Sequence, residues 1–461
     1  MKTYFRTDDH VPFSEKFGYW CGAMGYVFSM AVTVFIVYYG TENLAISAAA
    51  VGTMMMVVKI IDGVTDAVGG ILVDKTKAKT GKARPWFIRV AIPYGIVLFL
   101  TFCIPTGWGT TAKLIALAVM YILTVSVFGT MVGVAKYSLI ARMSMDPKER
   151  STMATIGDGS AVVFSSLLMT VTFSLVANFG YALIFAIYGV IGAVLCILCY
   201  VFVREQPEEI EGAIREEKEH QQANIAAIVK TLATNKYALL VFLYTTILYI
   251  GCGLIQTGGT YYATYVFGNY SVYSQFMLAG TIGSAVGIFA GTFIVRAIGS
   301  KWTFALGCLL TVVAYLPIIF TNSTSVITLV ISFFFVIMFS QVFTNTQTPV
   351  MIAAAADYGE WKTGVRSEGV TSGIADIGIK IGQALASGLF GLILTMGGYQ
   401  EGGVEQTASA IFSIKAAFTY VIPAVFLILG IFFLITYRLE KQHGQILADL
   451  EERHKAEGAQ A

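Results

Sequence analysis

Long apolar runs separated by short polar stretches dominate the chain and predict membrane-spanning helices. Each of these runs reaches the ~20 residues that an α-helix needs to cross a bilayer. They lie at 18–40, 46–73, 86–105, 112–142, 152–178 and 180–203, and then at 237–266, 271–297, 302–321, 324–353, 367–397 and 409–437. The pattern therefore predicts an all-α polytopic membrane protein with about twelve transmembrane helices.

The composition agrees with this class. The 461 residues are 56% hydrophobic and 13% charged, whereas soluble domains carry about 25% charged residues. The formal net charge of +2 gives no indication of a nucleic-acid partner. All six cysteines lie in apolar runs, where packing explains them better than metal binding or redox chemistry does.

Basic residues gather in the loops on one side of the predicted bundle. They are Lys75, Lys77, Lys79, Lys82, Arg84, Arg142, Lys148, Arg150, Arg296, Lys301, Lys362, Arg366, Arg438 and Lys441. Because loops rich in lysine and arginine stay in the cytoplasm, we expect both termini to be cytoplasmic. An even number of spans agrees with that orientation.

A single long polar stretch, 204–236, divides the chain into two six-helix halves, 1–203 and 237–437. Its many charged residues, Glu205 among them, predict a solvated cytoplasmic linker. The last stretch, 438–461, is expected to form a charged cytoplasmic tail helix. Two six-helix halves around a binding site at the membrane midplane are typical of major-facilitator transporters.

Three charged residues interrupt the second apolar run. Lys59, Asp62 and Asp66 are spaced i, i+3 and i+7, so they share one face of a helix. Such charges cost roughly 2.5–3.5 kcal/mol each at mid-membrane, so this face must point to a cavity or a partner helix. Two carboxylates one turn apart supply oxygens for a monovalent cation, and we interpret them as a cation site. A structural salt bridge to Lys59 or Lys136 is the alternative.

Other charges within the spans allow two interpretations each. Asp376 and Lys380 are spaced i, i+4, which suits an intrahelical ion pair. Alternatively, Lys380 points into the cavity and bridges cation and solute. Asp158 could pair with Lys136 on the preceding span, or it could contact the substrate.

Hydroxyl, aromatic and amide groups add candidate binding residues. Thr130, Gly133 and Tyr137 share one face of the fourth span, where the aromatic ring could stack on a sugar or simply pack. The tenth span is unusually polar and includes Asn345, which suggests a cavity wall. All four histidines lie outside the apolar runs, so any transported proton would be carried by carboxylates. No catalytic or phosphate-binding motif is visible, which argues against an enzyme and against a cofactor.

Two polar signatures resemble those of the glycoside–pentoside–hexuronide:cation symporters, the melibiose-permease relatives. The first joins 62–66 (Asp-Gly-Val-Thr-Asp) to 80–86 (Thr-Gly-Lys-Ala-Arg-Pro-Trp), and the second covers 357–366 together with Glu368. Residues 22–25 and Lys380 also match the pattern of this family, and the similarity extends over nearly the whole chain.

The resemblance implies uptake of a glycoside coupled to Na⁺, Li⁺ or H⁺ by alternating access, in a bacterial inner membrane. It implies that Asp62, Asp66 and Thr130 bind the cation. Tyr137 takes the place of a sugar-stacking tryptophan, and Lys380 matches the lysine of the eleventh helix. We add Asp158, Asn345 and Asp376 as candidate substrate residues, and Lys59, Lys136, Asp357, Glu360 and Arg366 as a candidate charge network.

Three positions depart from the melibiose-type pattern. Val27 stands at the position of the first-helix carboxylate that binds the sugar in those relatives. Gly133 stands at the position of their fourth-helix aspartate. The arginine of the fifth helix falls at Asp158, which reverses the charge. These changes remove the set that grips a galactoside in those relatives, so the resemblance does not carry galactoside specificity or Na⁺ coupling with it.

We therefore expect a monomeric symporter of a sugar or sugar acid with a monovalent cation, H⁺ or Na⁺, and without a further cofactor. The main alternative is a cation-coupled carrier of a lipid-like or other non-sugar solute. The signatures favour uptake over drug export. A non-transporting sensor or membrane enzyme has the least support.

Overall fold

The computed structural model describes residues 10–144, 146–206, 231, 233–270, 272–321, 325–339, 344–364 and 368–458. Its regular elements in these ranges are all helical. The chain forms two compact units, and unit 1 combines segments from both the first and the later part of the sequence. Unit 1 comprises 1–216, 260–278 and 388–414, and unit 2 comprises 217–259, 279–387 and 415–461. The predicted division at 203, 236 and 437 stays a prediction.

The first six predicted spans form the body of unit 1. Helix α1 (Phe13–Tyr38) continues as a π-helical turn, η1 (Tyr39–Asn43), and is followed by α2 (Ala48–Asp74) and α3 (Arg84–Leu100). The next spans are α4 (Thr110–Tyr121), η2 (Ile122–Gly129) and α5 (Thr130–Met143), then α6 (Pro147–Ala154), η3 (Thr155–Gly159) and α7 (Ser160–Phe179), and finally α8 (Tyr181–Phe202).

The later part of the chain supplies eight described α-helices and one described π-helical turn. These are α11 (Lys236–Phe267), α12 (Val272–Thr321), α13 (Val326–Ile337), α14 (Thr344–Thr363), α15 (Glu368–Met396), α16 (Ala408–Ala416), η6 (Ala417–Val421), α17 (Ile422–Thr436) and α18 (Glu440–Gly458). The predicted spans 271–297 and 302–321 both lie in α12, which turns at Gly299 with a φ of 79°. That φ is readily adopted only by glycine.

Local signals explain where several helices begin. The Ser47 side chain accepts a hydrogen bond from the Ala50 N–H and caps α2. Asp146 caps α6 in the same way, with Pro147 at the first helical position. Both arrangements satisfy N–H groups that have no partner within the first turn of a helix.

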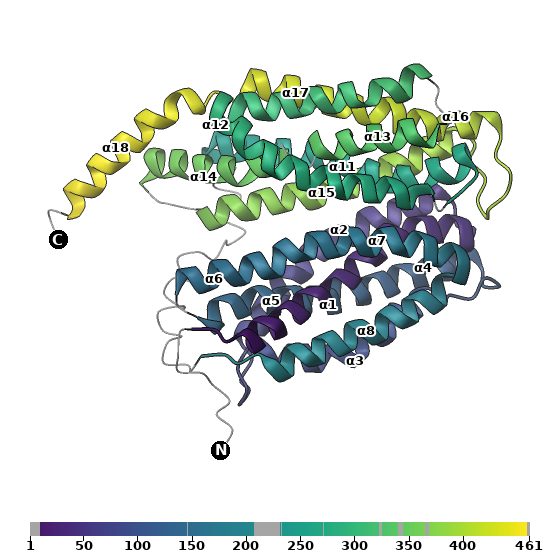
Figure 1. Cartoon of the computed structure of the whole chain (residues 1–461), viewed down its shortest axis with the longest axis horizontal. Coiled ribbons are helices and arrows are strands. Elements are labelled where there is room, and N and C mark those ends of the chain that lie inside the picture. The colour runs from purple at the N-terminus through teal and green to yellow at the C-terminus, as the bar shows by residue number, and fades with distance from the viewer. Residues whose placement is uncertain are drawn as a thin grey trace. The chain divides into compact units, whose positions relative to one another are not determined.

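Close backbone contact holds α3 against α8, which run side by side in unit 1 (Figure 1). A Cβ atom built on Gly189 would lie 2.3 Å from the carbonyl oxygen of Gly95. Small residues at such crossings let membrane helices approach closely and gain dispersion contacts that larger side chains would prevent.

Among the described residues, eight helical segments are long and apolar enough to cross a membrane. They are Phe13–Asn43, Thr110–Met143, Lys148–Phe179, Tyr181–Phe202, Lys236–Phe267, Ala297–Phe320, Gly369–Met396 and Ala408–Thr436. The expected all-α, multi-span architecture is therefore confirmed. The count of twelve spans and the cytoplasmic position of the termini stay predictions.

Candidate functional site

The charged face of α2 turns inward, while its opposite face is apolar and exposed. The Lys59 side chain is buried, and Asp62 and Asp66 are partly buried. By contrast, Ile60 and Val64 on the other face are each 62% exposed. This division matches the cost of placing charges in lipid, and it lets the α2 carboxylates meet neighbouring helices.

Asp66 meets the fourth span at Thr130. The Thr130 hydroxyl donates a 2.7 Å hydrogen bond to Oδ1 of Asp66. Thr130 is the first residue of α5, directly after the π-helical turns of η2. A π-helical insertion changes the direction of the side chains that follow it and is frequent at functional sites. The contact joins two of the three residues predicted to bind the cation.

Lys59 lies in the same region of unit 1. Its ammonium is 5.8 Å from the ring centroid of Tyr121 and is attracted electrostatically by Asp62 and Asp66. The Tyr121 hydroxyl lies 3.2 Å from Oγ1 of Thr33. The site therefore holds two carboxylates and one ammonium whose charges offset each other in part, which lowers the cost of burying them.

Lys136 and Asp158 form an ion pair with an N···O distance of 2.6 Å. The Lys136 side chain is 3% exposed and that of Asp158 is 47% exposed. Asp158 lies in the π-helical turn η3, between α6 and α7. The structure thus contains the salt bridge that the sequence left open, while half of the carboxylate surface stays accessible. A substrate contact through Asp158 stays a prediction.

Two tyrosine rings surround the Lys136 ammonium. It lies 4.0 Å from the ring centroid of Tyr137 and 5.6 Å from that of Tyr26. The Tyr26 ring fills the space beside Gly133, where an added Cβ would be 2.9 Å from Cε2 of Tyr26. The resemblance implies an aspartate at the position of Gly133. The space beside Gly133 instead holds the Tyr26 ring, close to the Lys136 ammonium.

Tyr19 is a further polar group that the sequence did not single out. Its side chain is fully buried, and its hydroxyl has no hydrogen-bond partner among the described residues. A Cβ atom on Gly157, the residue before Asp158, would lie 2.7 Å from the Tyr19 ring. Buried hydroxyls are rarely left unsatisfied, so Tyr19 is an exception among the described residues. No spacing rule along the chain signals such a residue.

The other predicted substrate residues lie in unit 2. Asp376 and Lys380 are both on α15. Asn345 is in the first turn of α14, and its side chain is not among those described. Their predicted roles stay predictions.

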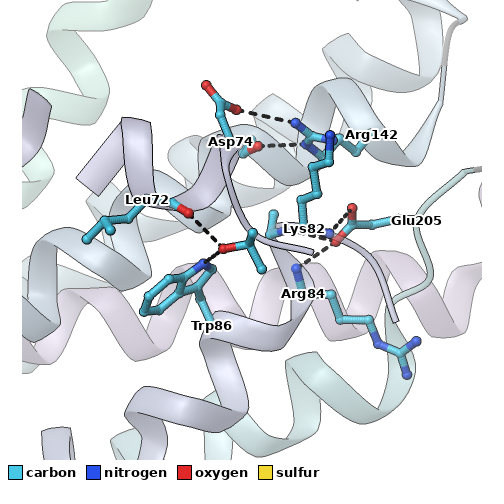
Figure 2. A network of polar contacts seen from close by, with 10 residues as sticks. Leu72, Asp74, Lys82, Arg84, Trp86, Arg142 and Glu205 are labelled. Atoms are coloured by element: carbon cyan, nitrogen blue, oxygen red, sulfur yellow. Dashed lines mark hydrogen bonds and ion pairs between the residues drawn. The ribbon is translucent and has the colours of Figure 1, made fainter. Parts of the chain in front are cut away.

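The first signature loop is built around a polar network in unit 1, shown in Figure 2. Asp74 at the end of α2 pairs with Arg142 of α5 at 3.3 Å. The Trp86 indole donates a 2.9 Å hydrogen bond to the Thr76 hydroxyl, which itself donates to the Leu72 carbonyl at 2.7 Å. These contacts fix the loop between α2 and α3.

Glu205 closes this loop, and its predicted place in a solvated linker is wrong. Its carboxylate accepts hydrogen bonds from the backbone N–H groups of Lys82, Ala83 and Arg84, at 3.0, 3.0 and 2.6 Å. The residue is only 2% exposed. Burial raises the pKa of the Glu205 carboxyl, whereas the three N–H groups at the start of α3 stabilise its charged form. The rest of the predicted linker that begins at 207 lies largely outside the described residues.

The second signature lies in unit 2 and contacts the last helix. Asp357 and Glu360, both buried, are on α14. The imidazole of His443 on α18 lies 3.0 Å from Oδ2 of Asp357, and the Trp361 indole donates to Asp449 at 2.9 Å. Arg366 lies outside the described residues. The predicted charge network thus includes a contact with α18 that the sequence did not indicate.

A stability measurement tests the Lys136–Asp158 pair. We expect Asp158→Asn to destabilise the protein by about 1–3 kcal/mol, because it leaves a buried ammonium without its counter-ion. The double variant Lys136→Met with Asp158→Asn should recover much of that loss. Denaturation of the purified proteins in detergent measures both effects. A double variant less stable than Asp158→Asn would contradict a structural ion pair.

Comparison with known proteins identifies the family of this chain. A family model described as MFS/sugar transport protein matches residues 18–441. The isoprimeverose transporter of Lactiplantibacillus pentosus is 28% identical, with 98% of this chain and 94% of the relative covered. A putative glycoside/cation symporter of Escherichia coli is 27% identical, with 97% and 96% covered.

A solved structure shows the same fold at low identity. A bacterial homolog of the human lysosomal transporter Spinster superposes with a TM-score of 0.68 at 12% identity, covering 94% of this chain and 98% of that one. The multi-span helical architecture, the two signatures and the match along most of the chain all indicate the same class of protein, a multi-pass membrane transporter. This protein is a multi-pass transporter of the bacterial inner membrane and not an enzyme, and it belongs to the MFS/sugar transport protein family.

Proposed function

We propose that this protein is a symporter that imports a glycoside, pentoside, hexuronide or related sugar with H⁺ or Na⁺ by alternating access. The observation that carries the proposal is the hydrogen bond from Thr130 to Asp66, next to Asp62 on the inward face of α2. It gathers two carboxylates and a hydroxyl, which are oxygen ligands suited to a small hard cation. A bound proton on either carboxylate would serve the same role.

The coupling follows from charge neutralisation. With the cation site empty, the charges of Asp62 and Asp66 beside Lys59 are only partly offset, and the carrier binds its solute weakly, so the half-loaded carrier is disfavoured. Cation binding neutralises the site and favours solute binding. The fully loaded or empty carrier then changes its facing state, so coupling is a difference in affinity between two states.

The solute is proposed to bind beside Tyr137 and Asp158. Tyr137 is 56% exposed and offers a ring face, and Asp158 offers a half-exposed side chain whose carboxylate can accept hydrogen bonds. An aromatic face and nearby hydrogen-bonding groups suit a sugar, which has both apolar faces and hydroxyls. The names of the relatives, a transporter of isoprimeverose and a glycoside/cation symporter, support the same solute class.

The energetics are sufficient for accumulation. One monovalent cation moving through ~100 mV contributes about 2.3 kcal/mol. At about 1.4 kcal/mol per decade, this supports roughly 50-fold accumulation of a neutral sugar.

A pH electrode in a dense, lightly buffered suspension of de-energised cells tests the proposal. Pulses of glycosides, pentosides, hexuronides and sulfonated sugars are added with and without Na⁺. Because proton symport removes H⁺ from the medium, we expect alkalinisation on the pulse that contains the solute. Cells that carry the empty vector provide the control.

Two further outcomes separate the alternatives. Entry of a labelled sugar that needs Na⁺ and causes no pH change would assign Na⁺ to the same carboxylates. A panel in which no sugar enters under either condition would refute the sugar proposal and favour a non-sugar solute.

A further inference from the structure

A polar cluster around a single carboxylate in unit 1 shares no residue with the candidate cation and solute sites. Glu42, in the π-helical turn that ends the first span, accepts hydrogen bonds on both carboxylate oxygens. One comes from the hydroxyl of Tyr265 on α11 and the other from that of Tyr399, just after α15. The two tyrosine oxygens are themselves 3.2 Å apart. We call these three residues the Glu42 cluster.

Neighbouring contacts join the same segments. The Thr41 hydroxyl lies 2.7 Å from that of Tyr261, and the Gly402 N–H donates to the Thr41 carbonyl at 3.0 Å. The Glu401 carboxylate accepts a 3.1 Å hydrogen bond from the Ala48 N–H at the start of α2. Thr41 and Tyr261 are fully buried and Tyr399 is 6% exposed, so this is an interior contact and not a set of surface side chains.

These contacts connect parts of the chain that belong to different predicted halves. Residues 41–48 join the first two spans, 261–265 end the seventh span, and 399–402 follow the eleventh. The loops at 44–47 and 397–407 are poor in lysine and arginine, so the positive-inside rule assigns them to the extracytoplasmic face. At that face, all of these contacts lie within unit 1.

We propose that the Glu42 cluster is a latch that keeps the extracytoplasmic side of the transporter closed and must open for solute to enter. The inference rests on the alternating access proposed above, in which the two halves separate at one face at a time. A contact between halves at the outer face has to break in the outward-open state. The Glu42 cluster is therefore a two-state element rather than a permanent part of the fold.

Glu42 is the central residue of this latch for a chemical reason. A carboxylate has two acceptor oxygens, so it can hold tyrosine hydroxyls from two different segments at once, and hydrogen bonds to a charged acceptor are stronger than neutral ones. An alanine at this position removes the carboxylate that both tyrosine hydroxyls share as an acceptor. The closed state loses both hydrogen bonds from the tyrosines, whereas an open state with hydrated tyrosines loses neither.

Cysteine accessibility tests the latch without a known solute. The reporter is Ala263→Cys, because Ala263 is fully buried next to the tyrosines of α11. The background carries Cys103→Ser, since Cys103 is the native cysteine that is not buried. A membrane-impermeant maleimide is applied to intact cells and to inside-out vesicles. Val404→Cys, at an exposed position in the loop after α15, identifies the side from which the reagent reaches this face.

We expect Glu42→Ala to accelerate labelling of the reporter about tenfold from the side that labels Val404→Cys, with a smaller effect in Glu42→Gln and Tyr399→Phe. The effects of Glu42→Ala and Tyr399→Phe should not add, since both remove the same contact. The matched control is Glu405→Gln, an exposed carboxyl in the same loop, which should leave labelling unchanged.

Unchanged labelling of the reporter in both Glu42→Ala and Glu42→Gln, with Val404→Cys still reactive, would overturn the latch. Glu42→Gln preserves the side-chain shape and keeps the test valid if Glu42→Ala does not fold. Because labelling needs no transport, a silent sugar panel together with faster labelling would refute the sugar proposal and leave the latch standing.

Discussion

Asp66→Asn is expected to abolish cation-driven accumulation of the solute while leaving downhill entry in place. The asparagine keeps an oxygen that can accept the Thr130 hydrogen bond, so the helix contact is retained. It removes the negative charge that a cation or proton must neutralise. Accumulation should therefore fall from roughly 50-fold at ~100 mV to no accumulation.

Uptake of labelled solute in energised and de-energised cells measures this effect. Glu405→Gln also removes one carboxylate, at an exposed loop position, and should accumulate solute like the parent. A second measurement needs no transport: Na⁺ or a lower pH should stabilise the parent against heat by mass action, and Asp66→Asn should lose that stabilisation. Undiminished accumulation by Asp66→Asn would remove Asp66 from the coupling site.

Gly81→Ala is expected to destabilise the protein by roughly 3 kcal/mol or more. Gly81 has a φ of 115°, a backbone conformation that residues with a Cβ rarely adopt. The added methyl group would lie 2.4 Å from the carboxyl carbon of Glu205. It would push away the carboxylate that caps the start of α3, so the N–H groups of the signature loop would lose their acceptor.

Protein abundance in membranes and the unfolding temperature in detergent measure this loss. Gly107→Ala is the matched control, because a Cβ atom there would meet open space and its φ is ordinary. Glu205→Gln should fall between the two, since its amide keeps one acceptor oxygen and turns a donor toward the remaining N–H. If Gly81→Ala unfolded at the same temperature as Gly107→Ala, the capping role of Glu205 would be wrong.

The burial of Glu205 and the ion-pair partner of Lys136 could not be predicted from the sequence. Glu205 begins a run of charged residues, and in such a run an exposed linker is the ordinary interpretation. Its burial depends on the α3 N-terminus, which the chain reaches more than a hundred residues earlier. Lys136 could be assigned two partners from the sequence, and only packing of α5 beside η3 gives the 2.6 Å contact with Asp158.

The all-helical, membrane-spanning class, the shared face of Lys59, Asp62 and Asp66, and the family resemblance could all be predicted from the sequence. Hydrophobic length, helical periodicity and signature motifs are local properties of the chain, so they can be read without coordinates. The folded structure was needed to show that Thr130 bonds to Asp66, that Tyr26 fills the space beside Gly133, and that Glu42 accepts hydrogen bonds from two tyrosines. Those contacts join residues far apart in sequence. They depend on which helix faces pack together, and periodicity along one helix does not specify that.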